Sequence, residues 1–349
     1  MTVLIYGSNG YTGRLITAHA VATGLRPMLA GRSIAPVREQ AERLGLEHRA
    51  FSLDDRNGLA DGLSGATVVM HCAGPFSRTS APMVDACLRA RIHYLDITGE
   101  IAVFEALAAR DAEAKAAGVM LLPGVGFDVV PSDCLAAHLV RRLPSATRLA
   151  LAFEARGGIS RGTAITIVDG SGGGGMVRRD GVIERVPAAW RTRQIDFGSG
   201  PTDVTSIPWG DVSTAFHSTG VGNIEVYTAM PPITRRIMVA TRYLGWPLRT
   251  RAIRGMLTRL VRSGPAGPSD AARAREISRL WAEATDRMGR RVVARLTTPQ
   301  TYTLTALTAV TAIRKTLAGG IAPGFQTPSR AFGPDFILEI PGVRREDVE

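Results

Sequence analysis

The segment VLIYGSNGYTGR, residues 3–14, decides the fold of this chain. An apolar run is followed directly by three glycines spaced three apart, Gly7, Gly10 and Gly13. Glycine permits the positive φ angles that a tight strand-to-helix turn needs. A glycine-rich turn that opens a helix also lets the pyrophosphate of a dinucleotide approach backbone N–H groups. The spacing GxxGxxG does not by itself choose between these two roles.

Apolar runs and helical stretches alternate from the N-terminus to about residue 123. Strands are expected at 2–6, 27–30, 48–53, 67–73, 92–97 and 119–123, with helices at 12–23, 34–44, 55–62, 80–90 and 101–117 between them. This alternation predicts successive βα units, and hence an α/β fold with a Rossmann-type doubly wound parallel sheet. A glycine turn between the first strand and the first helix of such a fold favours dinucleotide binding.

The pattern changes after Pro131, where a second, mixed α+β domain is predicted. Helices are expected near 132–142, 231–262 and 299–318, with a break near 245–247, and strands at 148–155, 204–209, 212–218, 223–230 and 290–297. We find no apolar stretch of about 18 uncharged residues, so no membrane-spanning helix is expected.

Length and composition favour a globular enzyme of two domains. The chain has 349 residues, of which 45% are hydrophobic and 21% charged,. Its first residues lack a basic leader, which predicts a cytoplasmic location. The cysteines, Cys72, Cys87 and Cys134, form no CxxC pair and no cluster with histidines. Neither a disulfide framework nor a metal site is therefore predicted.

The net charge of +11 is concentrated in one region. Residues 231–295 hold 15 arginines and four acids, and residues 231–262 hold eight arginines and no acid. Within 248–262 an apolar stripe opposes a basic face; the stripe is Ile253, Met256, Leu257 and Leu260, and the basic residues are Arg251, Arg254 and Arg262,. A solvated face is one interpretation. The alternative is an anionic partner, either a membrane surface or an acidic carrier protein.

Nucleic acid is not an expected partner, because this region has no recognition module and few aromatic residues for stacking.

The segment AGRS, residues 30–33, indicates which dinucleotide is bound. A fold that prefers NAD places an acidic residue after the second strand, whereas this chain has Arg32 and Ser33 there,. An arginine suits the 2′-phosphate of NADPH, although an exposed arginine after a strand can also be merely solvated. Asp54 follows the third strand, either near the adenine or as a helix cap.

The fourth strand ends in HCAGPF, residues 71–76, where small residues let a nicotinamide ring lie close,. His71 and Cys72 are expected to be packed strand residues. The full set of expected cofactor contacts is Gly7, Ser8, Asn9, Gly10, Tyr11, Thr12, Gly13, Arg32, Ser33, Asp54, Ala73, Gly74, Pro75, Phe76 and Gly126.

The candidate catalytic residues are Tyr94, Asp96 and Asp128. Strand alternation turns Tyr94, Asp96 and Thr98 of HYLDITGE to one side, where one of them is a candidate proton donor or orienting group,. Thr98 and Glu100 equally suit capping of the helix that begins near 101. In PGVGFDVVPSD, Asp128 follows two glycines that allow close approach of a nicotinamide, whereas the later aspartate opens a helix,.

Six segments together resemble the saccharopine dehydrogenase-like NAD(P)-dependent reductases: GSNGYTGR, AGRS, CAGPF, HYLDITGE, LLPGVGFDVVPSD and GFQTPSRAFG. Residues 208–227 and the overall length are similar to the trans-acting enoyl reductase branch. The resemblance implies a Rossmann domain at 1–130, an inserted α+β domain at 131–320 that forms the substrate cleft and often a homodimer contact, and a segment at 321–349 that returns to the first domain.

The expected activity is NADPH-dependent reduction of an activated C=C or C=N bond. The substrate is expected to be apolar, and carrier-linked or lipid-like. Two alternatives stay open, a saccharopine-type amine dehydrogenase and an NADPH-binding scaffold without turnover.

Overall fold

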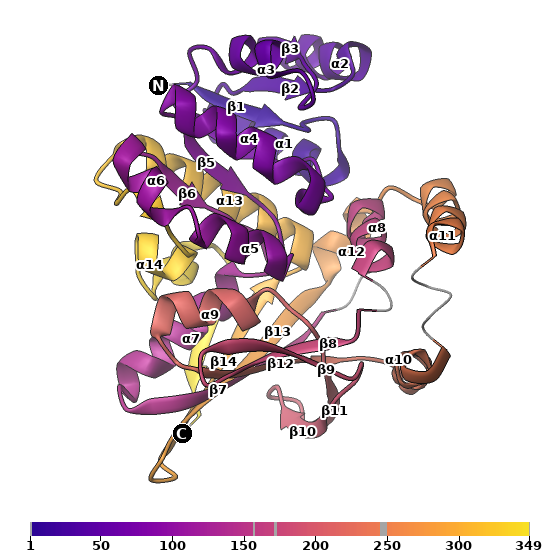
Figure 1. Cartoon of the computed structure of the whole chain (residues 1–349), viewed down its shortest axis with the longest axis vertical. Helices are drawn as coiled ribbons and strands as arrows, with labels where there is room; N and C mark the ends of the chain where they lie inside the picture. Colours follow the sequence, from indigo (N-terminus) through magenta and orange to yellow (C-terminus); the bar gives the residue numbers. More distant parts are fainter. Residues whose placement is uncertain (1, 156–157, 171–172, 245–249, 349) are drawn as a thin grey trace. The chain divides into compact units, whose positions relative to one another are not determined.

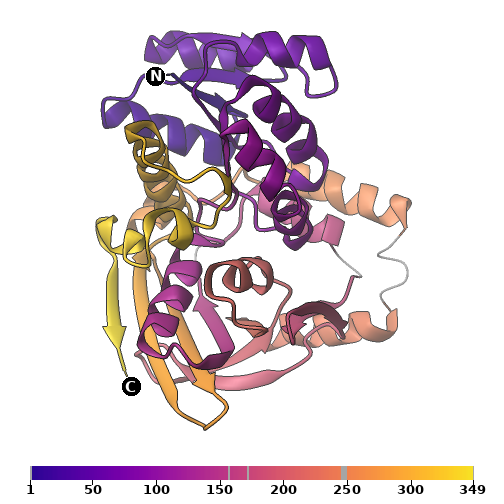
Figure 2. The same ribbon diagram turned by 60° about the vertical axis from the view of Figure 1, so that its left-hand side comes forward.

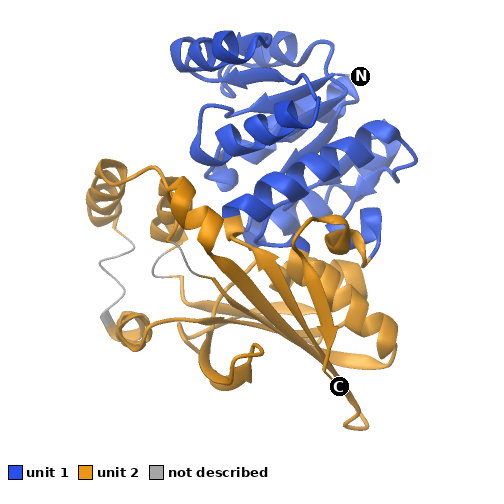
Figure 3. Cartoon of the chain, turned by 180° about the vertical axis from the view of Figure 1, so that it is seen from behind, with its two compact units in different colours: residues 1–130, 302–333 blue, residues 131–301, 334–349 orange. Residues whose placement is uncertain are grey.

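The computed structural model describes residues 2–155, 158–170, 173–244 and 250–348 (Figure 1). The chain divides into two compact units (Figure 3). The first unit contains Met1–Val130 and Tyr302–Gly333, and the second contains Pro131–Thr301 and Pro334–Glu349.

The first unit contains a seven-stranded sheet in the order β15-β6-β5-β4-β1-β2-β3. Its strands are β1 (Val3–Tyr6), β2 (Met28–Gly31), β3 (His48–Ala50), β4 (Val68–His71), β5 (His93–Asp96), β6 (Met120–Leu122) and β15 (Gly324–Phe325). Every neighbouring pair is parallel. All residues of β1, β2 and β4 are buried, because helices cover both faces of a parallel sheet,. The predicted doubly wound α/β fold is confirmed.

Helices connect these strands and pack beside them (Figure 2). They are α1 (Tyr11–Ala22), α2 (Ile34–Leu44), α3 (Arg56–Leu63), α4 (Phe76–Ala90), α5 (Ile101–Ala108), α6 (Asp111–Ala117), α13 (Thr301–Ala318) and α14 (Pro328–Phe332). The strand order reverses between β1 and β4, so the loops after these two strands diverge to opposite faces of the sheet. Ligands of doubly wound sheets bind at this point, outside the carboxyl ends of the strands.

The return of the chain to the first unit differs from the prediction. We expected the second domain to extend to residue 320 and residues 321–349 to return. Instead the return begins with α13, at Tyr302, and residues 334–349 belong to the second unit. There β16 (Arg344–Asp347) pairs with the edge of the second sheet. Helical periodicity in 299–318 indicated a helix but not which core the helix packs against.

The second unit contains a nine-stranded mixed sheet. Its strands, besides β16, are β7 (Ala146–Glu154), β8 (Gly175–Arg179), β9 (Val182–Val186), β10 (Thr192–Asp196), β11 (Pro201–Ser206), β12 (Asn223–Ala229), β13 (Ile277–Asp286) and β14 (Arg291–Pro299). The order is β10-β11-β12-β7-β13-β14-β16, and β8 pairs with β12 and β9. Among the described strands of this sheet, only β7 and β12 pair in parallel. This architecture is the predicted α+β type.

The helices of the second unit include α7 (Val130–Arg142), α8 (Arg161–Gly170), α9 (Asp211–Thr219), α10 (Pro232–Leu244), α11 (Arg251–Ser263) and α12 (Asp270–Arg275), with a short 3₁₀ helix at Phe336–Glu339. The predicted helical break at 245–247 lies outside the described residues. No helix in the described ranges is long and apolar enough to cross a membrane.

The expected strand at 212–218 is wrong, because these residues form helix α9. Short apolar runs do not distinguish a strand from a buried helix. Tertiary contacts decide here: the Arg178 guanidinium of β8 donates to the carbonyl of Val212 at 2.8 Å, and its carbon lies 4.2 Å from the centre of the Phe216 ring. These contacts hold the helix against the β8–β9 hairpin.

Candidate active site

The glycine turn after β1 lies directly against the turn after β4. A Cβ atom at Gly7, which has φ of +79°, would lie 2.9 Å from the Ala73 Cβ. A Cβ atom at Gly13 would lie 2.2 Å from the Gly7 carbonyl oxygen. Gly10 differs, because it is exposed and a Cβ there would meet only the Gly7 carbonyl, at 3.3 Å. Two of these glycines are therefore required by packing, and Gly10 leaves open space.

The turn at Gly10 has the features that a pyrophosphate site requires. Gly10 precedes the first residue of α1, and no side chain caps that helix. An uncapped helix N-terminus attracts phosphate through its free N–H groups and its dipole. The Ser8 hydroxyl is buried beside it, and it has no hydrogen-bond partner among the described residues. The turn thus presents backbone N–H groups and the Ser8 hydroxyl as hydrogen-bond donors, and Gly10 has no side chain that would cover them.

Other predicted residues of this turn pack against its neighbours. Asn9 lies over the end of β2, where its Oδ1 would be 3.3 Å from a Cβ at Gly31. Tyr11 packs edge-on against Tyr302 of α13, with ring centres 5.1 Å apart. Thr12 is half-buried in the first turn of α1.

Arg32 and Asp54 lie near the hydroxyl of Tyr6. Burial raises the pKa of Tyr6 to about 12, an increase that Arg32 opposes and Asp54 reinforces. The Arg32 side chain is exposed and makes no hydrogen bond or ion pair with the described residues. Ser33 precedes α2 without capping it through its side chain. A cation and a hydroxyl are therefore both free to bind an anion after β2.

Of the two alternatives for Asp54, the helix cap is excluded. The neighbouring Asp55 caps α3, since its Oδ1 accepts from the backbone N–H groups of Asn57 and Gly58, each at 3.1 Å. Asp54 instead accepts from the Ser52 hydroxyl at 3.4 Å. Its carboxylate is exposed at the edge of the sheet.

The turn after β4 is held by the buried His71 and the half-buried Thr79. The Thr79 hydroxyl donates to the Ala73 carbonyl at 2.7 Å, so His71 donates to Thr79 through Nε2, at 3.0 Å. Burial lowers the pKa of His71 to about 3, and the ring is neutral at physiological pH. His71 is thus a packed strand residue, as predicted, that positions the turn. Gly74 in this turn is exposed, and Pro75 precedes the first residue of α4.

Glu100 caps a different helix from the one expected. Capping of the helix that begins near 101 was one of the two roles expected for Thr98 and Glu100. The Glu100 carboxylate instead accepts from the backbone N–H groups of Phe76, at 2.7 Å, and Ser77, at 3.1 Å, at the start of α4. Thr98 accepts from the Glu100 N–H at 3.1 Å. Because the two segments are 24 residues apart in the chain, local capping rules did not predict this bond,.

Tyr94 and Asp96 are fully buried and bonded to each other. The Tyr94 hydroxyl donates to Asp96 Oδ2 at 2.7 Å, and Oδ1 accepts from the N–H groups of Thr98 and Gly124, each at 2.9 Å. Burial raises the pKa of Asp96 to about 6, although these three bonds oppose the increase,. A catalytic role for the pair stays a prediction. The contacts themselves show a positioning role, since they join the ends of β5 and β6.

Asp128 is half-buried in the loop between β6 and α7. Burial raises the pKa of its carboxyl to about 7. One carboxylate oxygen lies 2.7 Å from the position that a Cβ at Gly99 would take, so the glycine makes room for the acid. The Asp128 loop, residues 123–129, is bonded to α13, because Phe127 N donates to Thr305 at 3.0 Å and Thr308 donates to the Val125 carbonyl at 2.7 Å.

The loop glycines have a packing role that the sequence did not reveal. A Cβ at Gly126, an expected cofactor contact, would lie 3.0 Å from the Thr305 methyl. Gly124 has φ of +75°, and a Cβ there would lie 2.9 Å from the Phe104 ring. Both glycines therefore let the Asp128 loop pack closely, and the cofactor contact at Gly126 stays a prediction.

Buried rings support this edge of the sheet from below. Tyr6, His71 and Tyr94 come from neighbouring strands, with ring centres 5.6 and 6.1 Å apart. Phe76 packs edge-on against His71 at 5.4 Å. These packed rings lie beneath the loops that follow β1, β4 and β5.

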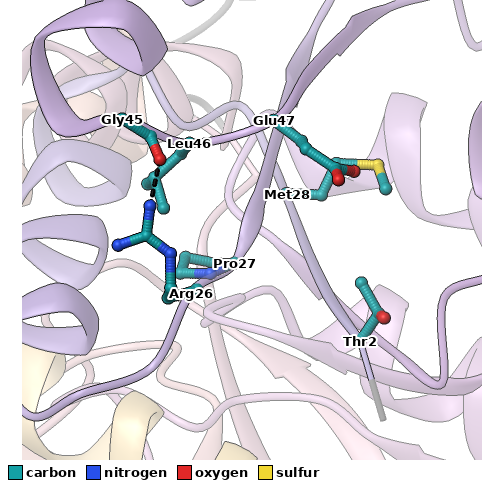
Figure 4. Close-up of a pocket in the computed structure, with 7 residues that line it drawn as sticks. All are labelled: Thr2, Arg26, Pro27, Met28, Gly45, Leu46 and Glu47. Carbon is teal, nitrogen blue, oxygen red and sulfur yellow. Dashed lines mark hydrogen bonds between the residues drawn. The ribbon is translucent and has the colours of Figure 1, made fainter.

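A depression of 310 Å³ lies at the amino ends of the strands, opposite the loops described above (Figure 4). Its lining comes from residues that precede β1, begin β2 or precede β3: Thr2, Arg26, Pro27, Met28, Gly45, Leu46 and Glu47. These residues lie at the amino ends of the strands. The depression contains none of the predicted site residues, and ligands of this fold bind at the carboxyl ends. No group of side chains in the described ranges could hold a metal ion.

Comparison with known proteins identifies the first domain. Residues 3–122 match the family model of the saccharopine dehydrogenase NADP binding domain. The chain is 31% identical over 149 residues to a trans-acting enoyl reductase of Mycobacterium leprae, covering 40% of this chain and 36% of the relative. It is 30% identical over 139 residues to a putative trans-acting enoyl reductase of Mycobacterium tuberculosis, covering 38% and 33%. The matches thus span about a third of the length of these relatives.

The fold as a whole is similar to that of a solved structure. Apo saccharopine dehydrogenase (L-Glu forming) from Saccharomyces cerevisiae aligns over 100% of both chains, with a TM-score of 0.66 and 13% sequence identity. At this identity the likeness shows the fold alone. The predicted resemblance is confirmed, and NADP is the cofactor of the first domain.

Substitution Gly10→Val is expected to remove NADPH binding without unfolding the protein. The added Cβ meets only the Gly7 carbonyl oxygen, at 3.3 Å, which a small shift relieves, and the rest of the side chain occupies the exposed space at the start of α1,. We expect the Kd for NADPH to rise at least about tenfold, a change of about 1.4 kcal/mol, with a largely intact fold. Gly13→Ala is the contrasting variant, because its Cβ clashes with the Gly7 carbonyl and should lower stability,. Normal NADPH binding by Gly10→Val would show that Gly10 serves only the turn.

Substitution Asp96→Ala is expected to destabilise the protein by about 2–5 kcal/mol, because it leaves two buried N–H groups without an acceptor. Asp96→Asn keeps an acceptor oxygen and should lose about 1 kcal/mol or less. Denaturant unfolding measures both values. Equal stability of Asp96→Ala and the wild type would show that the carboxylate does not hold these loops.

Proposed function

We propose that this chain, whose residues 3–122 form a saccharopine dehydrogenase NADP-binding domain, is an NADPH-dependent reductase. The bond reduced is an activated C=C or C=N bond of an apolar, carrier-linked or lipid-like substrate. One observation carries the proposal: an acid with a pKa of about 7, Asp128, lies at the same sheet edge as the dinucleotide turn. The names of the matched relatives, as enoyl reductases, favour C=C over C=N.

Binding residues and proton-transfer residues occupy different strands in this proposal. Arg32 and Ser33 bind the 2′-phosphate, and the turn at Gly10 binds the pyrophosphate. The turn at Ala73 and Gly74 gives the nicotinamide room at the end of β4. NADPH, when bound, supplies the hydride.

Asp128 supplies the proton that completes the reduction. Adding hydrogen across C=C or C=N requires one hydride and one proton, and a protonated carboxyl at this edge can donate the proton. With a pKa of about 7 the carboxyl is protonated in about half of the molecules at pH 7, and its partial exposure lets it regain a proton from water,. Tyr94 and Asp96 do not perform this step in the proposal, because both are fully buried. They hold the Asp128 loop in place.

The proposal is tested by NADPH consumption across enones, enoyl thioesters and cyclic imines. We expect turnover of enoyl thioesters, and a loss of at least about a hundredfold in kcat for Asp128→Asn, the usual contribution of a general acid. The Kd for NADPH should not change in this variant. Turnover of imines alone would support the amine dehydrogenase alternative. NADPH binding without consumption of any substrate would support the scaffold alternative.

The pH dependence of kcat is expected to report on Asp128. A proton donor is active in its protonated form, so kcat should be constant well below pH 7 and fall about tenfold per pH unit above it,. Asp128→Asn should remove this decrease from the residual rate. A decrease that persists in the variant would assign the titration to another group.

NADPH should bind at least about tenfold more tightly than NADH, because an arginine–phosphate pair is a strong charge-assisted contact. Arg32→Ala should abolish this preference while leaving NADH affinity unchanged. Arg38→Ala is the matched control, since Arg38 is an exposed arginine on α2. An unchanged NADPH to NADH ratio in Arg32→Ala would remove Arg32 from the site.

A further inference from the structure

Two helices of the second unit expose large apolar side chains. The α10–α11 surface, defined as residues 232–243 and 252–263, contains Ile233, Ile237 and Tyr243, which are 61%, 59% and 79% exposed, and Met256 and Leu260, which are 62% and 69% exposed. Figures 1 and 3 show both helices on the same side of the second unit. Single exposed apolar residues are ordinary, whereas a contiguous exposed patch indicates a binding surface. Each helix exposes two apolar residues one turn apart, Ile233 with Ile237 and Met256 with Leu260.

On α10 the apolar residues form the outer face. Ile233 and Ile237 are one helical turn apart, and Arg236 lies beside them,. The opposite face is turned toward the protein, because Arg242 donates to the carbonyls of Ala188 and Ala189 at 2.7 and 2.6 Å. The outward position of the isoleucines is therefore fixed by a contact on the other side of the helix.

On α11 the apolar stripe predicted from the sequence is only partly covered. Ile253 and Leu257 are half-buried, and α11 packs against α8. Met256 and Leu260 extend from the same stripe into solvent. The predicted basic face also differs, because Arg254 is half-buried and has other interactions, whereas Arg262 is exposed. The side chain of Arg251 and residues 245–249 lie outside the description.

The exposed arginines of this surface lack acidic neighbours in the chain. No acid occurs between residues 231 and 262. Four side chains are exposed and form no hydrogen bond or ion pair with the described residues: Arg235, Arg236, Arg259 and Arg262. Several other arginines of the same unit form ion pairs with acids, as Arg193 does with Glu283 at 3.1 Å. Residues 231–262 therefore carry positive charge that no acid within the same segment neutralises.

We infer that the α10–α11 surface binds an anionic lipid bilayer. Amphipathic helices with arginines beside aliphatic and aromatic residues lie in the membrane interface, where both kinds of side chain are satisfied. A bilayer is favoured over an acidic protein because the apolar residues are spread along two convex helix surfaces. Lipid covers such surfaces without matching their shape, whereas a protein partner needs a complementary surface. This inference does not depend on the proposed reaction.

The test is co-sedimentation of the full chain with vesicles of phosphatidylcholine alone, or of phosphatidylcholine mixed with phosphatidylglycerol, at low and high salt. We expect binding to the mixed vesicles only, and weaker binding at high salt, because exposed charges are screened within about 8 Å at physiological ionic strength. A small acidic carrier protein is tested in parallel. Binding of the carrier protein with no binding of vesicles would overturn the inference.

Two sets of variants separate the electrostatic and the apolar parts of the interaction. Changing Arg235, Arg236, Arg259 and Arg262 together to Gln should lower the partition coefficient about fivefold for each arginine, and so more than about a hundredfold in total. Changing Ile237 and Leu260 to Ser should lower it at least about fivefold, because inserted aliphatic groups are lost.

The control variant has the same net charge as the arginine variant. It changes four exposed arginines elsewhere to Gln, namely Arg38, Arg43, Arg185 and Arg287. Melting temperature and NADPH affinity confirm that each variant is folded. Equal losses in the control and the test variant would reduce the effect to net charge and contradict a defined surface. No effect of Ile237→Ser and Leu260→Ser would contradict insertion.

Discussion

A single buried carboxylate, Asp96, holds together the loops on which the candidate site depends. It accepts from Tyr94, Thr98 and Gly124 at 2.7–2.9 Å, and so joins the end of β5 to the start of the Asp128 loop. Burying a charge is unfavourable unless its hydrogen bonds are satisfied, and here all three partners are within the protein. The raised pKa shows that these bonds only partly offset the burial. The loops at the carboxyl ends of β5 and β6 are therefore held by Asp96, a carboxylate whose burial is itself unfavourable.

The strand order then separates two chemical roles along this edge. Arg32 follows β2 and Asp128 follows β6, and the order β6-β5-β4-β1-β2 places these strands four spacings apart, or about 19 Å,. Between them lie the glycine turn after β1 and the turn after β4, above the neutral ring of His71. A cation and an acid would neutralise each other as an ion pair if they were adjacent. Their separation leaves Arg32 available to a phosphate and lets Asp128 keep a raised pKa.

The sequence predicted those parts of the fold and site that depend on local pattern. Alternating strands and helices predicted the doubly wound sheet, which is confirmed, whereas dinucleotide binding at the glycine turn stays a prediction. Contacts between distant segments escaped this reasoning. Glu100 caps a helix that begins 24 residues earlier in the chain, and α9 packs against the β8–β9 hairpin through Arg178. Gly126 was expected to accommodate a ligand, yet its packing against Thr305 already requires a small residue.

When the chain returns to its first unit, α13 forms hydrogen bonds with the Asp128 loop. Thr305 and Thr308 bond to Phe127 and Val125 across 178 and 183 residues of sequence. The first 130 residues contain every predicted cofactor-binding and catalytic residue, but they lack these two hydroxyl groups. Without them a buried N–H and a buried carbonyl of the Asp128 loop would lose their partners, at a cost of about 1–3 kcal/mol each. The position of the acid therefore depends on a helix that the chain makes only after it has traversed the second unit.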